Sequence, residues 1–204
     1  MRPPPPRQAR GHEQARSTFA SAGPSLLAFA LAVSSCAAAQ LTGPARLYDV
    51  TWSGLGAGGY DVVAYFTDHA AVPGKPGLTA VDRGVAYRFA STAHQELFLA
   101  DPDKYLPAWG GNCAWAVANR GTFGSTPTSF LVRDGRLFLF HDSIFFDAKA
   151  TWLRESASAQ GELVHSGDAY WAELVARASQ REDEEGRRSQ AAHHQVRARA
   201  AKGQ

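Results

Sequence analysis

Three side chains in the middle of the chain have the chemistry of metal ligands or of thiol catalysis: His94, Cys113 and His141. Thiolate and imidazole are ligands that suit Zn²⁺ and copper. Cys113 also follows Gly110 and Gly111 near the predicted start of a helix, where the helix dipole lowers a thiol pKa, and a catalytic thiol needs a histidine or another base beside it. No two of the three are spaced as a local ligand pair, so only the fold can bring them together.

A second set of candidates is aromatic. Four aromatic side chains fall in or next to glycine-rich turns, and with Cys113 they are expected to line a shallow apolar pocket for a small ligand. These residues are Tyr60, Tyr65, Trp109 and Trp115. The alternative is that the four rings form the hydrophobic core and that Cys113 is a small buried hydrophobe. Because the chain has no G-x-S-x-G, phosphate-loop or H-E-x-x-H motif, we expect a binding module, with a thiol-dependent enzyme or redox protein that uses Cys113 as the alternative.

Composition separates a globular middle from two basic ends. Residues 40–176 hold all five Trp and 20 of the 22 aromatic residues, which supplies enough apolar surface for one core. The same range carries 10 Lys and Arg against 14 Asp and Glu, a net charge of −4. A nucleic-acid-binding core needs a basic surface. We therefore expect no nucleic-acid partner, whereas a protein partner stays open.

The first 39 residues have the order of an export leader. Four Arg precede the apolar run 25–33, and small residues suited to cleavage after Ala39 follow it. The run is shorter than the roughly 20 residues that span a bilayer, so we expect no transmembrane span in the mature chain. The prediction is a secreted or periplasmic protein. A leader rich in Arg and poor in acids also fits organelle targeting, and "VSSC" resembles a bacterial lipobox that would anchor a lipid on Cys36.

Two turn signals between apolar runs predict β-hairpins. One hairpin is expected over residues 78–89, around "DRG", and the other over residues 129–142, around Asp134-Gly135. A further strand is expected over residues 60–66, "YDVVAYF", because β-branched and aromatic residues follow a glycine-rich turn there.

The helix with the clearest boundaries is expected between residues 91 and 100. Ser91 or Thr92 can cap it, and it must end before Pro102. Leu97 and Phe98 form its apolar face, which leaves His94 on the exposed surface. The apolar spacing predicts further helices over residues 108–121, 143–155 and 168–178.

These elements give an α+β fold, in which a small antiparallel sheet with hairpins packs against three or four short helices. We expect four parts along the chain: a leader, a linker, the α+β domain, and a charged tail that is disordered or a frayed helix. Their bounds are residues 1–39, 40–57, 58–176 and 177–204.

Four segments in this order and spacing, "GYDVVAYF", "AYRFAS", "FLADPDKY" and "GGNCAWAVA", resemble a YHS domain-containing protein. The likeness covers about residues 58–172 and is greatest to the exported branch of the family. Some YHS modules bind heavy metals through three cysteines, and those positions fall here on Ala64, Ala90 and His94. The two alanines argue against an inherited metal role, because a structural zinc site needs about four ligands. The resemblance implies an exported, non-enzymatic module that binds a small ligand or, as its cofactor, a transition metal.

Overall fold

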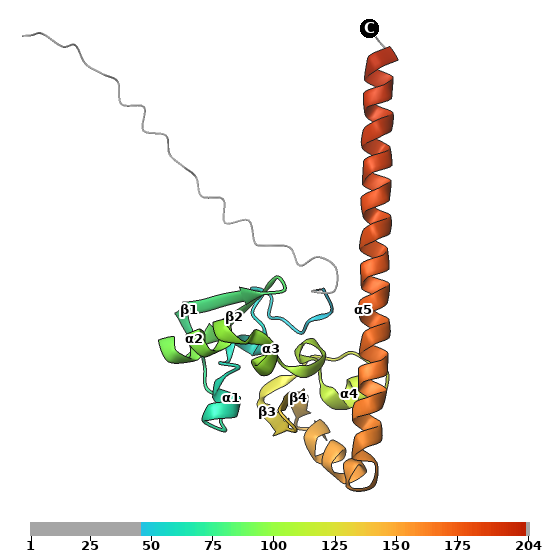
Figure 1. Ribbon diagram of the computed structural model, residues 1–204. Helices are drawn as coiled ribbons and strands as arrows, with labels where there is room; N and C mark the ends of the chain where they lie inside the picture. Colours follow the sequence, from blue (N-terminus) through green and yellow to red (C-terminus); the bar gives the residue numbers. More distant parts are fainter. Residues whose placement is uncertain (1–45, 203–204) are drawn as a thin grey trace, which may run out of the picture. The chain divides into compact units, whose positions relative to one another are not determined.

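The computed structural model describes residues 46–202, apart from the side chains of residues 156–160, 199 and 202. The predicted leader, with Cys36, lies outside this range. Within the described residues the fold is α+β, as the sequence predicts, with two-stranded antiparallel sheets and α-helices (Figure 1). No helix in this range is long and apolar enough to cross a membrane.

Both predicted hairpins are confirmed. Strand β1 (Lys75–Asp82) pairs with β2 (Val85–Phe89), and β3 (Thr126–Arg133) pairs with β4 (Arg136–Phe140). Both central residues of each turn have positive φ, as the tight turn that suits twisted strands requires: 51° for Asp134 and 73° for Gly135 in the second hairpin. These turns are local features, which is why the sequence reveals them.

The predicted strand over residues 60–66 is wrong. Helix α1 (Ala64–Thr67) begins inside it, after a turn that Asp61 stabilises. Asp61 Oδ1 accepts hydrogen bonds from the backbone N–H groups of Val63 at 2.9 Å and Ala64 at 3.3 Å. An Asp side chain that captures backbone donors two and three residues on competes with strand formation. The β-branched residues that suggested a strand are buried in the core instead.

The capped helix is confirmed as α2 (Thr92–Ala100), because Ser91 Oγ accepts a hydrogen bond from the backbone N–H of His94 at 3.1 Å. Helix α3 (Pro102–Tyr105) follows at once. Phe98 is buried, but Leu97 is 43% exposed. Only one of the two residues expected on the apolar face of α2 therefore belongs to the core.

The helix expected over residues 108–121 is divided in two. A 3₁₀ turn, η3 (Ala108–Gly111), precedes α4 (Ala114–Ala118). Within the turn, Trp109 and Gly110 have φ values of 51° and 62°, which no right-handed helix contains. Another 3₁₀ turn, η2 (Ala57–Gly59), precedes α1.

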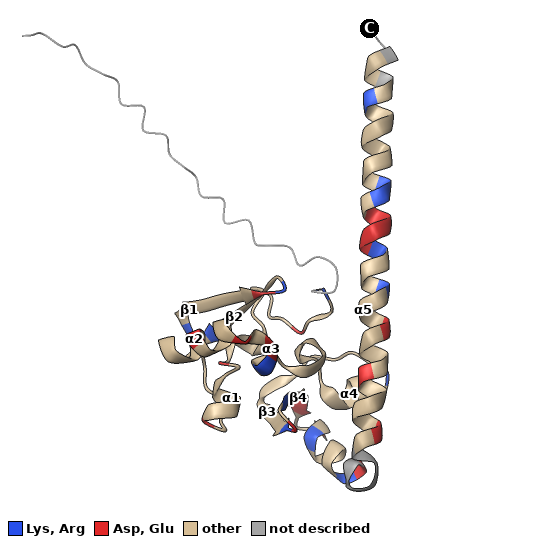
Figure 2. Ribbon diagram, viewed as in Figure 1, with Lys and Arg blue, Asp and Glu red and all other residues tan. Residues whose placement is uncertain are grey.

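The helices expected over residues 143–155 and 168–178 belong to one element, α5 (Ala148–Lys202). Residues 142–147 form a small hairpin of β5 (Asp142–Ser143) and β6 (Phe146–Asp147). Ile144 and Phe145 lie at its turn, 91% and 92% exposed, so the helix expected from residue 143 begins only at Ala148. The charged tail, expected to be disordered or a frayed helix, is helical to Lys202, and charged residues recur along it (Figure 2).

The expected linker, residues 40–57, is part of the domain in its described portion. The backbone N–H of Asp49 donates to the carbonyl of Gly110 at 2.9 Å, and Asp49 Oδ2 accepts from the backbone N–H and the hydroxyl of Ser125. Tyr48 and Val50 pack against the core. The packed domain therefore begins before residue 58.

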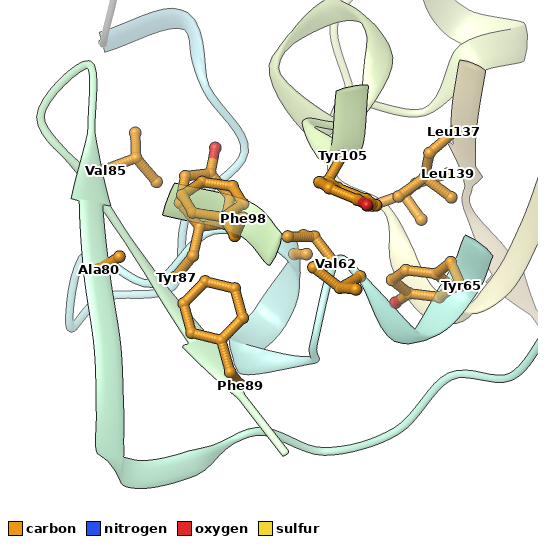
Figure 3. Packing of buried hydrophobic residues seen from close by; sticks show 12 residues of the cluster. Val62, Tyr65, Ala80, Val85, Tyr87, Phe89, Phe98, Tyr105, Leu137 and Leu139 are labelled. Carbon is orange, nitrogen blue, oxygen red and sulfur yellow. The ribbon is translucent and has the colours of Figure 1, made fainter. Parts of the chain in front are cut away.

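Two hydrophobic clusters form the core. The first joins α1, α2 and the β1–β2 hairpin, where the ring of Phe98 packs against Tyr87 and Phe89 (Figure 3). The second joins η3, α4, β4 and α5 around Trp109 and Trp152. Gly167 of α5 is buried on this cluster, because a Cβ atom there would lie 2.4 Å from Cζ2 of Trp109.

Candidate functional site

The first site is built around Asp61, whose side chain is fully buried. Oδ1 accepts from the two backbone donors of the α1 turn, Val63 and Ala64, and Oδ2 accepts from the backbone N–H of Ala90 and from Nδ1 of His94, each at 2.7 Å. Four donors around one carboxylate offset much of the cost of burying it. Asp61 thereby ties α1 to the end of β2 and to α2.

His94 is held by this carboxylate. Its side chain is 16% exposed, so the expectation of a loose surface residue was wrong. A carboxylate can only accept, so Nδ1 carries a proton, and in the neutral ring Nε2 presents its lone pair. Nε2 lies 3.4 Å from Thr67 Oγ1 and 3.8 Å from Asp68 Oδ1. A carboxylate on one ring nitrogen that leaves the other available is the usual arrangement behind a metal-bound histidine.

The three positions that the sequence resemblance aligns with cysteines meet at Asp61. The backbone N–H groups of Ala64 and Ala90, and the ring of His94, all contact this carboxylate. These residues do not fit a thiolate metal site, because the alanines supply no ligand atom and the Asp61 oxygens already accept these donors. A hydrogen-bonded carboxylate joins the same three chain segments.

A second site lies beside Cys113. A cavity of about 300 Å³ is lined by three residues that the sequence singled out and by three that it did not. The expected residues are Cys113, Trp115 and His141, and the others are Ala116, Phe123 and Phe146. The rings of Phe123 and His141 pack edge-to-face with their centroids 4.7 Å apart. The rings of Trp115 and Phe146 pack in the same way with their centroids 5.1 Å apart. Cys113 itself is 1% exposed.

Two other predicted ligand residues are core residues instead. Tyr65 is buried, its ring packs on Phe130, and its hydroxyl donates to the carbonyl of Pro127 at 2.9 Å; burial raises the pKa of Tyr65 far above its usual value. Trp109 is buried in the second cluster, and its Nε1 donates to Asp168 Oδ1 at 2.9 Å. Tyr60 is half-buried against the first cluster. The core alternative therefore holds for these three rings.

The metal set proposed from the sequence is not assembled. His94 pairs with Asp61, whereas Cys113 and His141 line the cavity of the second cluster. Among residues 46–202, no group of three or more His, Cys, Asp or Glu side chains is placed to hold a metal ion.

Sequence reasoning missed Asp61, Phe123 and Phe146. Asp61 carried a local signal, since an acidic residue directly before a run of apolar residues must be exposed or satisfied by donors. Phe123 and Phe146 carried none, because their part in the cavity depends on how α4, β4 and the β5–β6 hairpin meet.

Comparisons of the chain with protein-family models, with curated proteins and with solved structures found no match. The resemblance to YHS proteins therefore stays a prediction from the four sequence segments.

Proposed function

We propose that the chain is an exported, non-enzymatic YHS-type module that binds a small apolar ligand in the cavity beside Cys113. The observation that carries this proposal is the lining of the cavity by Trp115, Phe123 and Phe146 around a buried thiol. Its volume of about 300 Å³ is at the lower end of the range of small-molecule sites. A ligand of one or two rings fits such a space.

The position of Cys113 favours binding over thiol catalysis. A catalytic thiolate needs a partly exposed, electropositive environment and a base that a third group orients. Cys113 is almost fully buried, and the His141 ring that shares its cavity packs on Phe123. A thiol in this environment acts as a small hydrophobe.

The binding test uses the neutral two-ring fluorescent probe 1-naphthylamine with a cavity-filling variant. Ala116→Leu adds three carbon atoms at the cavity wall and should weaken probe binding at least about tenfold, because the probe and the new side chain need the same space. The matched control is Ala93→Leu, at an exposed position of α2. Equal probe affinity in both variants would count against the cavity.

The thiol alternative has its own test. Cys113→Ala should leave probe binding within about threefold of the wild type, and native protein should resist alkylation by iodoacetamide until it is unfolded. Rapid alkylation of the native protein would favour a reactive Cys113 and the enzyme hypothesis.

The export part of the proposal is tested separately. Sequencing the N-terminus of the mature protein should give a chain that starts after Ala39, as the apolar run and the small residues of the leader predict. A mature chain that still begins at Met1 would contradict export and leave the binding site untouched.

A second candidate function is transition-metal binding at His94, favoured by one geometric observation. His94 Nε2, Thr67 Oγ1 and Asp68 Oδ1 form a triangle. Thr67 Oγ1 lies 2.9 Å from Asp68 Oδ1 and 3.4 Å from His94 Nε2, and the remaining side, from His94 Nε2 to Asp68 Oδ1, is 3.8 Å. A point equidistant from the three atoms lies about 2.0 Å from each, close to the length of a Zn²⁺ bond to nitrogen or oxygen. A metal at this point is coplanar with its three ligand atoms, which leaves the positions above and below the plane to water, so the site would be weak.

Elemental analysis of tag-free protein and zinc titration by calorimetry test this candidate. Zinc should bind the wild type, and both His94→Asn and Asp68→Asn should reduce its affinity by about tenfold or more. His69→Asn, at an exposed position outside the triangle, is the control. Equal zinc affinity in all four proteins would rule the site out.

A further inference from the structure

The turn of the β5–β6 hairpin carries two large apolar side chains that the described part of the chain leaves uncovered. Ile144 and Phe145 are 91% and 92% exposed, and they lie between the paired residues Ser143 and Phe146. Tight turns of two residues favour Gly, Asn and Asp, which adopt the required backbone and remain well hydrated. Neither the turn nor the core therefore accounts for Ile and Phe here, and we call this pair the apolar tip.

The apolar tip adjoins the cavity beside Cys113. Phe146, the next residue along the chain, lines that cavity and packs on Trp115. Phe123, in the same lining, is 57% exposed, so the cavity reaches the surface there. Apolar side chains thus continue from the tip to the cavity, and a partner that covers the tip lies close to any ligand in the cavity.

The charged residues of this hairpin are carboxylates. Asp142 and Asp147, on either side of the apolar tip, are exposed, and residues 137–148 contain no Lys or Arg. Asp147 Oδ1 accepts a hydrogen bond from the backbone N–H of Ala150 at 2.8 Å, which fixes this carboxylate at the base of the hairpin. Carboxylates are repelled by anionic headgroups and attracted by the ammonium groups that phosphatidylcholine presents to water. The charge pattern therefore favours a neutral, zwitterionic lipid surface.

The size of the apolar tip favours a lipid surface over a protein partner. Two large side chains supply roughly 300–400 Å² of apolar area, about half of the ~800 Å² that each partner of a stable protein complex buries. A second copy of the chain would also bring the carboxylates of both hairpins together around a twofold axis, where they repel each other. A bilayer needs no matching pocket, because binding at its interface depends on the apolar area that enters it.

We propose that the apolar tip inserts into the surface of a neutral lipid bilayer and docks the module there. Docking holds the cavity beside Cys113 next to the hydrocarbon from which an apolar ligand enters. The docking depends on the tip alone, whereas its role in ligand exchange rests on the function proposed for the cavity. Transfer of each side chain out of water should strengthen binding about tenfold or more, so two of them give a weak, reversible association.

Co-sedimentation of the mature protein with phosphatidylcholine vesicles tests the docking. The double variant Ile144→Ser, Phe145→Ser should bind the vesicles about a hundredfold more weakly than the wild type, because both side chains that enter the bilayer are lost. Trp52→Ser is the matched control, since it removes a fully exposed apolar ring from another turn. The control should bind within about threefold of the wild type, as expected for a residue outside the contact.

A tryptophan at the tip locates the contact. In Phe145→Trp, vesicles with brominated acyl chains should quench the fluorescence of the added indole. Leu99→Trp, at an exposed position of α2, should show no such quenching. This readout identifies the tip even where another part of the chain also touches the bilayer.

The docking and the ligand site can fail separately. The double variant should keep the affinity of the wild type for 1-naphthylamine in solution without vesicles, because neither of its residues lines the cavity. Ala116→Leu should lose affinity for the probe and still bind the vesicles as the wild type does.

Three outcomes would overturn the docking. Equal sedimentation of the wild type and the double variant, including none by either, would leave the tip without a lipid contact. Binding that requires anionic lipid and disappears at high salt would assign the contact to the basic end of α5, where residues 187–202 hold five Lys or Arg and no Asp or Glu. Self-association in solution that the double variant abolishes would identify a second copy of the chain as the partner.

Discussion

The two core clusters differ in whether their buried polar groups have hydrogen-bond partners. In the first cluster, Asp61 is fully buried and receives four hydrogen bonds from three segments of the chain. In the second cluster, the Trp152 indole N–H is buried without a described partner, and residues of this cluster line two cavities, one beside Cys113 and one between the β3–β4 hairpin and α5. The comparison indicates closely satisfied packing around Asp61 and unfilled space around the tryptophans.

Packing explains the difference. Phe98 fits between two rings of a hairpin whose buried residues alternate along β2. The second cluster combines two tryptophans with small residues such as Ala114 and Gly167. Large rings beside small side chains fill space unevenly, which leaves cavities that a ligand can occupy.

The largest expected effect on stability is in the first cluster. Phe98→Ala should lower the free energy of unfolding by about 3–5 kcal/mol, because it removes a buried ring from the centre of the first cluster. Its neighbour Leu97→Ala should cost less than about 1 kcal/mol, since that side chain is 43% exposed. Urea unfolding of both variants gives the comparison. Similar losses would mean that Leu97 contributes to the core after all.

Breaking the Asp61–His94 pair should give the second-largest loss in the free energy of unfolding. Asp61→Asn should cost about 2–3 kcal/mol, because an amide nitrogen would face two of the four donors. His94→Ala should cost about 1–2 kcal/mol, more than for an exposed helix residue, because one Asp61 oxygen loses a donor. The double variant should lose less than the sum of the two, and additive losses would contradict a coupled pair. Thermal melts of the wild type and His94→Ala with and without chelator show whether a bound metal adds to the stability that His94 provides.

Asp168 tests the polar edge of the second cluster. Burial raises the pKa of Asp168, but hydrogen bonds from Arg136 and Trp109 outweigh it, so the net pKa lies below the usual 3.8. A carboxyl whose pKa is lower in the folded protein stabilises it above its unfolded pKa, and this stabilisation is lost as pH falls through the folded pKa. Asp168→Ala should cost about 1–2 kcal/mol at pH 7, because the buried Trp109 N–H loses its acceptor.

The difference between wild type and Asp168→Ala should shrink as pH falls below about 4, where the carboxyl of the unfolded chain starts to take up its proton, and should be lost once the pH is below the lower pKa of the folded state. Urea unfolding from pH 7 to pH 2.5 measures it. A constant difference across this range would show that the ionised form of Asp168 is not what stabilises the cluster.

The smallest effect is expected far along α5. Residues 187–198 are exposed, so deleting residues 187–204 should change the melting temperature by less than about 2 °C. A deletion from residue 180 should cost more, since it removes Arg181, Glu182 and Glu185, which border a cleft with Arg46 and Leu47. A loss of several degrees from the shorter deletion would mean that this part of the helix packs against something.

The sequence by itself determined the local features of this protein. The Asp134-Gly135 turn, the Ser91 cap and the helix break before Pro102 each depend on residues within one turn of each other, so short-range rules identify them. The apolar face of the helix over residues 91–100 likewise located the core residue Phe98.

Only the tertiary structure decided which distant residues meet. Asp61 and His94 are 33 positions apart, and their hydrogen bond depends on α1 and α2 packing together. Cys113 and His141 share a cavity because Cys113 lies beside Leu139 of β4, a pairing that no local pattern encodes. Ile144 and Phe145 have helical spacing with Ala148 and Trp152, yet they form a hairpin turn. Pairing between segments outweighs local periodicity there, because the propensity of a short segment is weak against the packing of its neighbours.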